Sequence, residues 1–215
     1  MTKNKEIIGI IGYGVVGKAA EATFSKEYDI LKYDKYTLQD SFESLSLADY
    51  ILISVPSPFD YEKNLLNDSA ILESLEMLNN MNYNKPVIIK STLAPGSCDS
   101  YSDLFDLKIV YNPEFLRESK TPFEDFARQD TIVIGTNDNS YILSKLIESM
   151  YQKVCIDSAK YYHLSYLEAE MVKSAQNTML SSRVALSNVI FDACQNYDID
   201  YDVIREIAFD RFEIL

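Results

Sequence analysis

The sequence predicts a doubly wound α/β domain followed by a long helix. Short, β-branched apolar runs alternate with segments of helical periodicity up to about Asp157. A glycine turn joins the first apolar run to the first helical segment. From about Leu164 to Asn196 there is neither Gly nor Pro, and apolar residues recur with a helical period.

Seven apolar runs have the composition of strands. Most are nearly continuous in hydrophobicity, which is typical of parallel strands buried on both faces. The expected strands are Ile7–Ile11, Asp29–Tyr33, Tyr50–Val55, Val87–Lys90, Ile109–Tyr111, Thr131–Ile134 and Val154–Ile156. Helices are expected between them at Val15–Phe24, Ser69–Leu78 and Tyr141–Tyr151. This alternation is typical of a doubly wound sheet covered by helices.

The last quarter of the chain has a different character. A helix of some 30 residues would be roughly 45–50 Å long, longer than a usual globular helix. A second helix is expected from about Asp202 to Ala208. Two helices cannot form a core alone, so this part must pack on the α/β domain or on a second copy of the chain. We therefore expect one domain over 1–160 and part of a helical domain over 161–215. The apolar positions of the long helix are Leu167, Met171, Val172, Ala175, Met179, Leu186, Val189, Ile190 and Ala193.

Composition and charge narrow the possible partners. The net charge of −13 makes nucleic acid an unsuitable partner, because phosphate binding requires clustered Lys and Arg. No segment has the run of about 20 apolar residues that spans a membrane, and the N-terminus lacks the apolar core of a signal peptide. The three cysteines and one histidine favour neither a disulfide framework nor a metal site. We expect a reduced, cytoplasmic protein without membrane contact.

The glycine turn predicts a dinucleotide site in a Rossmann-like domain. The segment Gly12, Tyr13, Gly14, Val15, Val16 and Gly17 ends a strand and begins a helix. Glycines there permit a tight turn and a close approach of the backbone to a pyrophosphate at the helix N-terminus. Asp34 ends the second strand, where a carboxylate can accept hydrogen bonds from ribose hydroxyls. An acid at this position favours NAD over NADP, although the neighbouring Lys35 leaves that preference open.

Two further strands end in small hydroxyl residues. One strand ends in Ser54-Val55-Pro56-Ser57-Pro58, and another in Lys90-Ser91-Thr92. Because ligands of open α/β sheets lie beyond the carboxyl ends of the strands, Val55, Pro56, Ser57, Ser91 and Thr92 are candidate cofactor-binding residues. Taken singly, each segment could equally be a turn whose hydroxyls satisfy backbone groups.

Two pairs of polar residues are spaced by one helical turn. Glu114 and Glu118 could serve as a general base and a water-positioning group beside a substrate, or could be solvated charges. Lys173 and Asn177 could stabilise an alkoxide or a carbonyl oxygen during hydride transfer, or could be an exposed lysine and an incidental amide. Spacing alone leaves both alternatives open.

Five segments, in order, resemble the UDP-glucose/GDP-mannose dehydrogenase family. They are Gly12 to Gly17; Ser54 to Pro58, similar to Val-Pro-Thr-Pro; Lys90 to Gly96, similar to Lys-Ser-Thr-Val-Pro-Pro-Gly; Asn112 to Ser119, nearly identical to Asn-Pro-Glu-Phe-Leu-Arg-Glu; and Glu168 to Asn177, similar to the start of the family's central helix. The resemblance covers essentially the whole chain.

The resemblance implies an enzyme that oxidises the C6 alcohol of a nucleotide sugar such as UDP-glucose to a carboxylate with NAD. It assigns Thr92, Glu114 and Glu118 to water and substrate positioning, with Glu118 also beside the cofactor. It assigns Lys173 and Asn177 to oxyanion stabilisation. It also implies a homodimer that pairs through the long helix 164–196.

One departure from the family pattern concerns the catalytic cysteine. Family members carry it in a Gly-Gly-x-Cys-x-Pro-Lys-Asp context, which Cys98, Cys155 and Cys194 all lack. We therefore expect a shortened form without the cysteine segment and the second nucleotide-binding domain, with impaired full turnover. Two alternatives remain: a β-hydroxyacid dehydrogenase-like enzyme that uses Lys173 and Asn177, and a non-catalytic NAD-binding or dimerising module.

Overall fold

The computed structural model describes residues 5–37, 39–115, 122–137 and 140–210. By the density of internal contacts the chain forms two compact units, Met1–Lys173 and Ser174–Leu215. The division falls inside the long helix, and the expected domain boundary near residue 160 stays a prediction.

The first unit is built on a seven-stranded sheet. Its strands, in spatial order, are β2 (Asp29–Tyr33), β1 (Ile7–Ile11), β3 (Tyr50–Ile53), β6 (Pro86–Ile89), β7 (Lys108–Tyr111), β8 (Thr131–Thr136) and β9 (Lys160–Ser165). The first five run parallel. The strand order reverses between β1 and β3, and the carboxyl ends of strands at such a switch point form the usual ligand crevice of this architecture.

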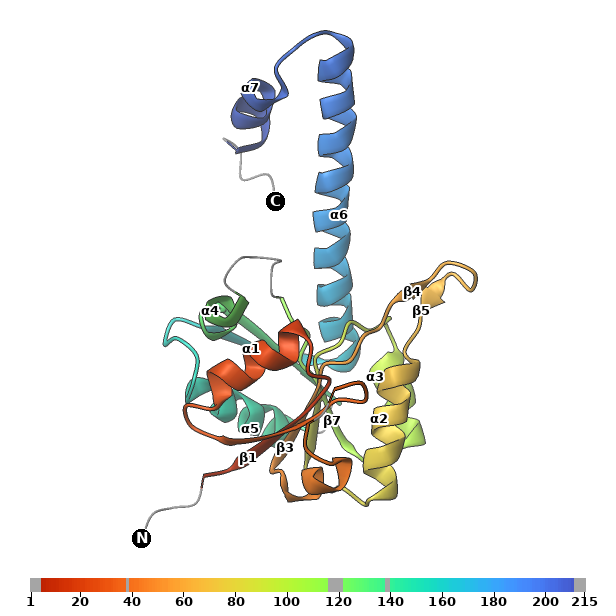
Figure 1. The fold of residues 1–215 in the computed structure, drawn as a ribbon, viewed down its shortest axis with the longest axis vertical. Coiled ribbons are helices and arrows are strands. Elements are labelled where there is room, and N and C mark those ends of the chain that lie inside the picture. The colour runs from red at the N-terminus through yellow and green to blue at the C-terminus, as the bar shows by residue number, and fades with distance from the viewer. Residues whose placement is uncertain (1–4, 38, 116–121, 138–139, 211–215) are drawn as a thin grey trace. The chain divides into compact units, whose positions relative to one another are not determined.

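Helices cover both faces of the sheet, which confirms the predicted doubly wound fold (Figure 1). One face is covered by α1 (Val15–Phe24), α4 (Pro122–Ala127) and α5 (Tyr141–Gln152). The other is covered by α2 (Ser69–Asn80), α3 (Ser97–Leu104) and a 3₁₀ helix, Phe42–Leu47. The continuous apolar strands supply both cores, because successive side chains point to opposite faces. Ile51 and Ile53 pack on the α2 side, whereas Leu52 packs on the α1 side.

Three expectations about the sheet need correction or addition. The strand expected at Val154–Ile156 is wrong: these residues form the turn after α5, and the last strand is β9. The tyrosine-rich run of β9 favours a strand, but the expected domain boundary at residue 160 falls in this run, so no strand was expected there. Strand β8 pairs antiparallel to β7. The sequence does not predict this direction, because a buried strand is equally apolar in either direction. A small hairpin of β4 (Phe59–Asp60) and β5 (Leu65–Leu66) was not predicted.

The helical part follows the prediction. Helix α6 runs over Tyr166–Asn196 without interruption, and α7 (Tyr201–Arg205) continues into a π-helical turn, Glu206–Asp210. Within the second unit, the rings of Phe191 and Tyr201 lie 5.4 Å apart in an edge-to-face contact. Among the described residues, no helix has both the length and the apolar composition that crossing a membrane requires.

Candidate active site

The glycine turn between β1 and α1 leaves room for a ligand. Gly12 has a φ of +90°, and a Cβ on it would lie 2.7 Å from the carbonyl oxygen of Ser54. A Cβ on Gly17 would strike the carbonyl oxygen of Gly12, so this glycine lets helix and strand approach closely. A Cβ on Gly14 would meet no described atom within 4 Å. Two glycines are thus required by the fold, whereas Gly14 borders open space.

The N-terminus of α1 is suited to an anion. Within the described part of the chain, no side chain caps this terminus at Gly14, and the first turn holds no acidic residue. Its first backbone N–H groups therefore keep their donor capacity, and the helix dipole adds a partial positive charge. Tyr13 precedes them, and its hydroxyl group donates a hydrogen bond to the carboxylate of Glu21.

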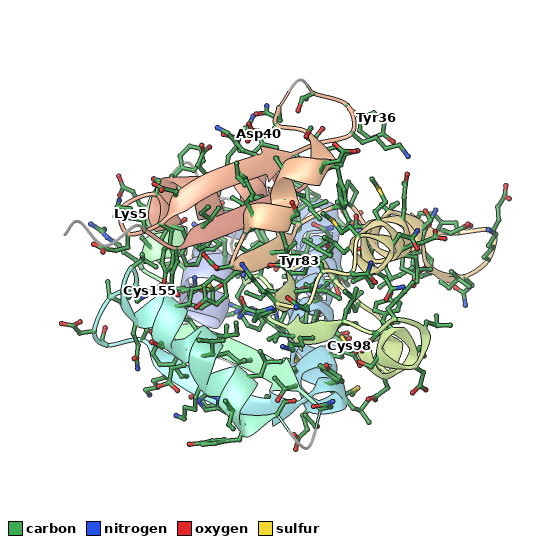
Figure 2. All side chains as sticks on the ribbon, turned by 90° about the horizontal axis from the view of Figure 1, so that it is seen from below. Lys5, Tyr36, Asp40, Tyr83, Cys98 and Cys155 are labelled. Carbon is green, nitrogen blue, oxygen red and sulfur yellow. The ribbon has the colours of Figure 1, made fainter. Side chains whose placement is uncertain are left out.

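Asp34 lies at the end of β2, beside the glycine turn. Its Oδ2 accepts the backbone N–H of Tyr13 at 2.8 Å, and its Oδ1 accepts those of Tyr36 at 3.0 Å and Thr37 at 3.1 Å. The hydrogen bond from Tyr13 is the largest cause that lowers the pKa of Asp34. Burial acts to raise this pKa, and the hydrogen bonds from Tyr36 and Thr37 lower it further. Asp34 is therefore a fixed, ionised carboxylate. Figure 2 shows Tyr36 and Asp40 at opposite ends of the loop that follows β2.

A cavity of about 210 Å³ lies beyond the carboxyl ends of β1, β2 and β3 and against α2. Six of the predicted cofactor-binding residues line it: Gly12, Gly14, Asp34, Lys35, Val55 and Pro56. Of the other described residues predicted for this role, Tyr13, Val15, Val16 and Gly17 belong to the glycine turn and α1, and Ser57, Ser91 and Thr92 lie after β3 and β6. The cavity has the lining of a small-molecule site, mostly apolar with a few polar and charged groups.

The lining also contains residues that the sequence did not assign to cofactor binding. They are Ile11, Tyr33, Tyr36, Ser54, Ala70, Glu73, Ser74 and Met77. Four of them, Ala70, Glu73, Ser74 and Met77, come from α2. Their spacing of three and four residues places them on one face of that helix, and this periodicity was the signal that could have identified them.

The hydroxyl residues after β3 and β6 connect neighbouring strand ends. Ser54 Oγ donates to the carbonyl oxygen of Gly12 at 2.8 Å, and Ser91 Oγ donates to that of Val55 at 2.6 Å. Ser57 Oγ donates to the carbonyl oxygen of Thr92 at 2.8 Å. These serines therefore satisfy backbone carbonyls, as in the alternative in which each segment is a turn. Ligand contacts by Ser57, Ser91 and Thr92 stay predictions.

Glu114 is a buried counterion and not a solvated charge. Its Oε2 lies 3.0 Å from the ammonium nitrogen of Lys90, and the two side chains are only 8% and 1% exposed. Lys90 also donates to Asn112 Oδ1 at 2.8 Å and to Tyr151 Oη at 3.0 Å. Burial acts to lower the pKa of Lys90, but the charge of Glu114 and the Tyr151 hydroxyl group outweigh it and keep this pKa above its usual value. The network joins the ends of β6 and β7 to α5.

Lys173 lies beside Glu114. Its ammonium nitrogen donates to the carbonyl oxygen of Glu114 at 2.6 Å and lies 5.2 Å from the centre of the Phe115 ring. Burial lowers the pKa of Lys173; the charge of Lys90 acts in the same direction, and that of Glu114 opposes it. Asn177 is an exposed residue of the second unit, and its role stays a prediction. Glu118 lies outside the described residues.

None of the three cysteines is part of the cavity lining. Cys98 is buried in the core on the α3 side, and burial raises the pKa of its thiol above the ordinary value. Burial also raises the pKa of Cys155 to about 11, on the opposite face of the sheet (Figure 2). Cys194 is buried in the second unit. The described residues contain no group of three or more His, Cys, Asp or Glu side chains that could hold a metal ion.

Comparisons with known proteins match both parts of the chain. The sequence model of the UDP-glucose/GDP-mannose dehydrogenase family, NAD binding domain, matches residues 29–155, more than half of the chain. The model of the central domain of the same family matches residues 167–214. The UDP-glucose 6-dehydrogenase of Campylobacter jejuni is 31% identical over 76% of this chain, and that of Rickettsia bellii is 26% identical over 83%. The match spans 41% of the length of each relative.

Solved structures show the same fold. A UDP-glucose dehydrogenase from Pyrobaculum islandicum superposes with a TM-score of 0.81 at 19% identity, covering 98% of this chain and 58% of that one. A GDP-mannose dehydrogenase from Pseudomonas aeruginosa, solved as a ternary complex, gives 0.78 at 19% identity, covering 97% and 57%. The glycine turn, the buried Lys90–Glu114 pair and the contact of Lys173 with Glu114 thus occur in a fold common to nucleotide-sugar dehydrogenases. Together with the match of both domain models, this shows that the chain belongs to the UDP-glucose/GDP-mannose dehydrogenase family.

Proposed function

We propose that this chain binds NAD and forms the cofactor part of a nucleotide-sugar dehydrogenase that resembles UDP-glucose 6-dehydrogenase. The observation that carries the proposal is the uncapped N-terminus of α1, next to a cavity that is bordered by the carboxylate of Asp34. The helix N-terminus suits an anionic pyrophosphate, the cavity suits an adenosine group, and the carboxylate suits the ribose hydroxyls.

The residues present fit the cofactor. The pyrophosphate would accept hydrogen bonds from the amides that begin α1, at the open side of Gly14. The adenosine ribose would donate to the oxygens of Asp34, which are already oriented by three backbone N–H groups. The exposed ring of Tyr36 and the side chain of Met77 supply apolar surface for the base. NAD supplies the hydride acceptor when bound.

The proposed substrate chemistry rests on the residues near Glu114. Lys173, with its lowered pKa, is suited to exchange a proton with a sugar hydroxyl and to stabilise an oxyanion. Thr92, Glu114 and Glu118 are proposed to position the sugar and a water molecule, and Asn177 to contribute to oxyanion stabilisation. The UDP-glucose 6-dehydrogenases that the chain matches suggest a UDP-sugar as the substrate.

The thiol needed for a covalent second oxidation is a separate question. A nucleophilic cysteine must reach the thiolate form and contact the substrate. Burial opposes both for Cys98, and it raises the pKa of Cys155 to about 11. We therefore propose that none of the three cysteines acts as this nucleophile, so that the 215 residues alone have impaired turnover to the carboxylate.

Calorimetric titration with NAD tests the cofactor proposal. We expect binding to the wild-type chain, and an affinity about 10- to 100-fold lower for Asp34→Asn, because hydrogen bonds to a charged group are lost. Since the pKa of Asp34 is lowered, its carboxylate stays ionised and its contribution should be constant between about pH 5 and 8. It should be lost only as the pH falls through that lowered pKa.

Asp40→Asn is the matched control. Asp40 lies in the same loop and accepts the backbone N–H of Lys32 at 2.9 Å, but it is not part of the cavity lining. This variant should bind NAD as the wild type does. Absence of NAD binding to a folded wild-type chain would overturn the proposed function.

We also propose that the chain forms a homodimer through α6. In the second unit Met179, Leu186 and Val189 are 45%, 53% and 64% exposed and lie on one face of the helix. Apolar side chains that recur on one exposed face are typical of an interaction surface. Light scattering should give twice the chain mass of 24.6 kDa for the wild type, and the monomer mass for Leu186→Glu.

Asn188→Glu controls for the added charge in that experiment. Asn188 is exposed on the opposite side of the same helical turn, so this variant should stay dimeric. A monomeric wild type at micromolar concentration would contradict the proposed partner.

A further inference from the structure

An ion pair crosses the lining of the proposed adenosine cavity. The ammonium nitrogen of Lys35 lies 2.6 Å and 2.9 Å from the two carboxylate oxygens of Glu73. Lys35 directly follows Asp34 in the chain, whereas Glu73 lies on α2, and all three residues line the cavity. The pair therefore connects the loop after β2 to the helix on the other side of the site.

The position of Lys35 is the one that a 2′-phosphate would require. Asp34 is placed to accept the ribose hydroxyls, so a phosphate on the 2′ oxygen would lie next to this carboxylate and its sequence neighbour. A lysine there is a natural phosphate partner. In this chain both Glu73 oxygens already accept from that lysine, and the pair holds it as a protonated ammonium group.

The local charge balance disfavours a phosphorylated cofactor. The cavity lining holds two carboxylates, Asp34 and Glu73, and one ammonium group, Lys35, which leaves one net negative charge there. A 2′-phosphate carries close to two negative charges at neutral pH. It would have to displace Glu73 from Lys35 and to approach Asp34 as well. A ribose with free hydroxyls faces neither requirement.

We propose that Glu73 is a specificity-determining residue that keeps this site selective for NAD over NADP by holding Lys35. The inference rests on the proposed function, because it assumes that a dinucleotide occupies the cavity. It resolves the ambiguity of the sequence, in which the acidic Asp34 favours NAD and the adjacent Lys35 favours NADP. Selectivity then depends on a residue of α2 that is 38 positions away from Lys35.

The pair is exposed enough to be changed without harm to the fold. The side chains of Lys35 and Glu73 are 55% and 49% exposed. Exposed ion pairs contribute little to stability, so Glu73→Gln should unfold at the wild-type temperature. Any change in cofactor preference in this variant can therefore be attributed to the site.

Titrations of wild type and Glu73→Gln with NAD and with NADP test the inference. We expect the affinity of Glu73→Gln for NADP to rise by about 10-fold, because one repulsive charge is removed and a lysine becomes available to the phosphate. The affinity for NAD should change by less than about 3-fold. The gain for NADP should shrink as salt is raised, as expected for an exposed charge interaction.

Two further variants make the test specific. Glu76→Gln removes the same charge from the exposed side of α2, outside the cavity lining, and should leave the NADP to NAD ratio unchanged. The double variant Glu73→Gln with Lys35→Met should lose the gain for NADP, since the phosphate partner is absent.

The possible failures can be distinguished. If the wild type binds neither dinucleotide, the proposed function fails. If the wild type binds NAD but Glu73→Gln keeps the wild-type preference, the role of Glu73 is overturned. If the gain for NADP persists in the double variant, the role of Lys35 is overturned.

Discussion

Gly14→Asp should abolish NAD binding and leave the protein as stable as the wild type or slightly more stable. Gly14 has a φ of −81° and extended backbone, which any residue can adopt, and a Cβ there meets no described atom within 4 Å. Aspartate is a favourable N-cap, so it should stabilise α1 by a few tenths of a kcal/mol relative to glycine. The same carboxylate would occupy the position proposed for the pyrophosphate.

The expected loss of affinity is at least ~100-fold. Two like charges about 4 Å apart near a protein surface repel by about 4 kcal/mol before screening, and each ~1.4 kcal/mol is a factor of ten. Calorimetry measures the affinity, and thermal unfolding in the absence of NAD measures the stability. A loss of function without a loss of stability separates ligand contact from a folding defect.

Gly14→Asn distinguishes charge from size. Asparagine has nearly the same volume as aspartate and is an equally good N-cap. Its bulk should weaken NAD binding relative to the wild type. Because it adds no charge, its affinity for NAD should stay at least about 10-fold higher than that of Gly14→Asp. Equal affinities of the two variants would show that no anionic group lies at the start of α1.

The elements around the glycine turn could be predicted because their signals are local. The bounds of β1 and α1 match the expected Ile7–Ile11 and Val15–Phe24. A strong apolar run, a turn that only glycine permits and a helical period succeed one another within 20 residues. The same holds for Asp34, whose place at the end of β2 follows from the strand before it.

Other features could not be predicted because they depend on contacts between distant segments. Glu114 was as compatible with a solvated charge as with a functional carboxylate, and only the approach of Lys90 and Lys173 decides this. The contribution of α2 to the cavity depends on how that helix packs beside β1 and β3. The direction of β8 depends on its pairing with β7, which its apolar composition does not encode.

The buried pair of Lys90 and Glu114 leads to the prediction with the largest effect on stability. Lys90→Met should lower the free energy of unfolding by about 3–5 kcal/mol, because the variant takes away the ammonium group that lies 3.0 Å from the buried carboxylate of Glu114. It also removes the donor to Asn112 Oδ1 and Tyr151 Oη. For a domain of this size, each kcal/mol corresponds to about 2–4 °C in the unfolding temperature. Lys63→Met, at a 72% exposed side chain, should change stability by less than ~0.5 kcal/mol.

A double substitution tests whether the cost arises from the buried charge of Glu114. Lys90→Met with Glu114→Gln removes both charges, and the glutamine can still accept the backbone N–H of Phe115 as Glu114 Oε1 does at 3.0 Å. At least half of the lost stability should therefore return, because an uncharged pair is far less costly to bury than a carboxylate that has lost the ammonium group of Lys90. If the double variant is less stable than Lys90→Met, the packing of the lysine stem and its neutral hydrogen bonds dominate. Lys173 donates to the backbone carbonyl group of Glu114, which the substitution by glutamine keeps. The double variant therefore separates the stability of this network from the chemistry proposed for the Glu114 carboxylate.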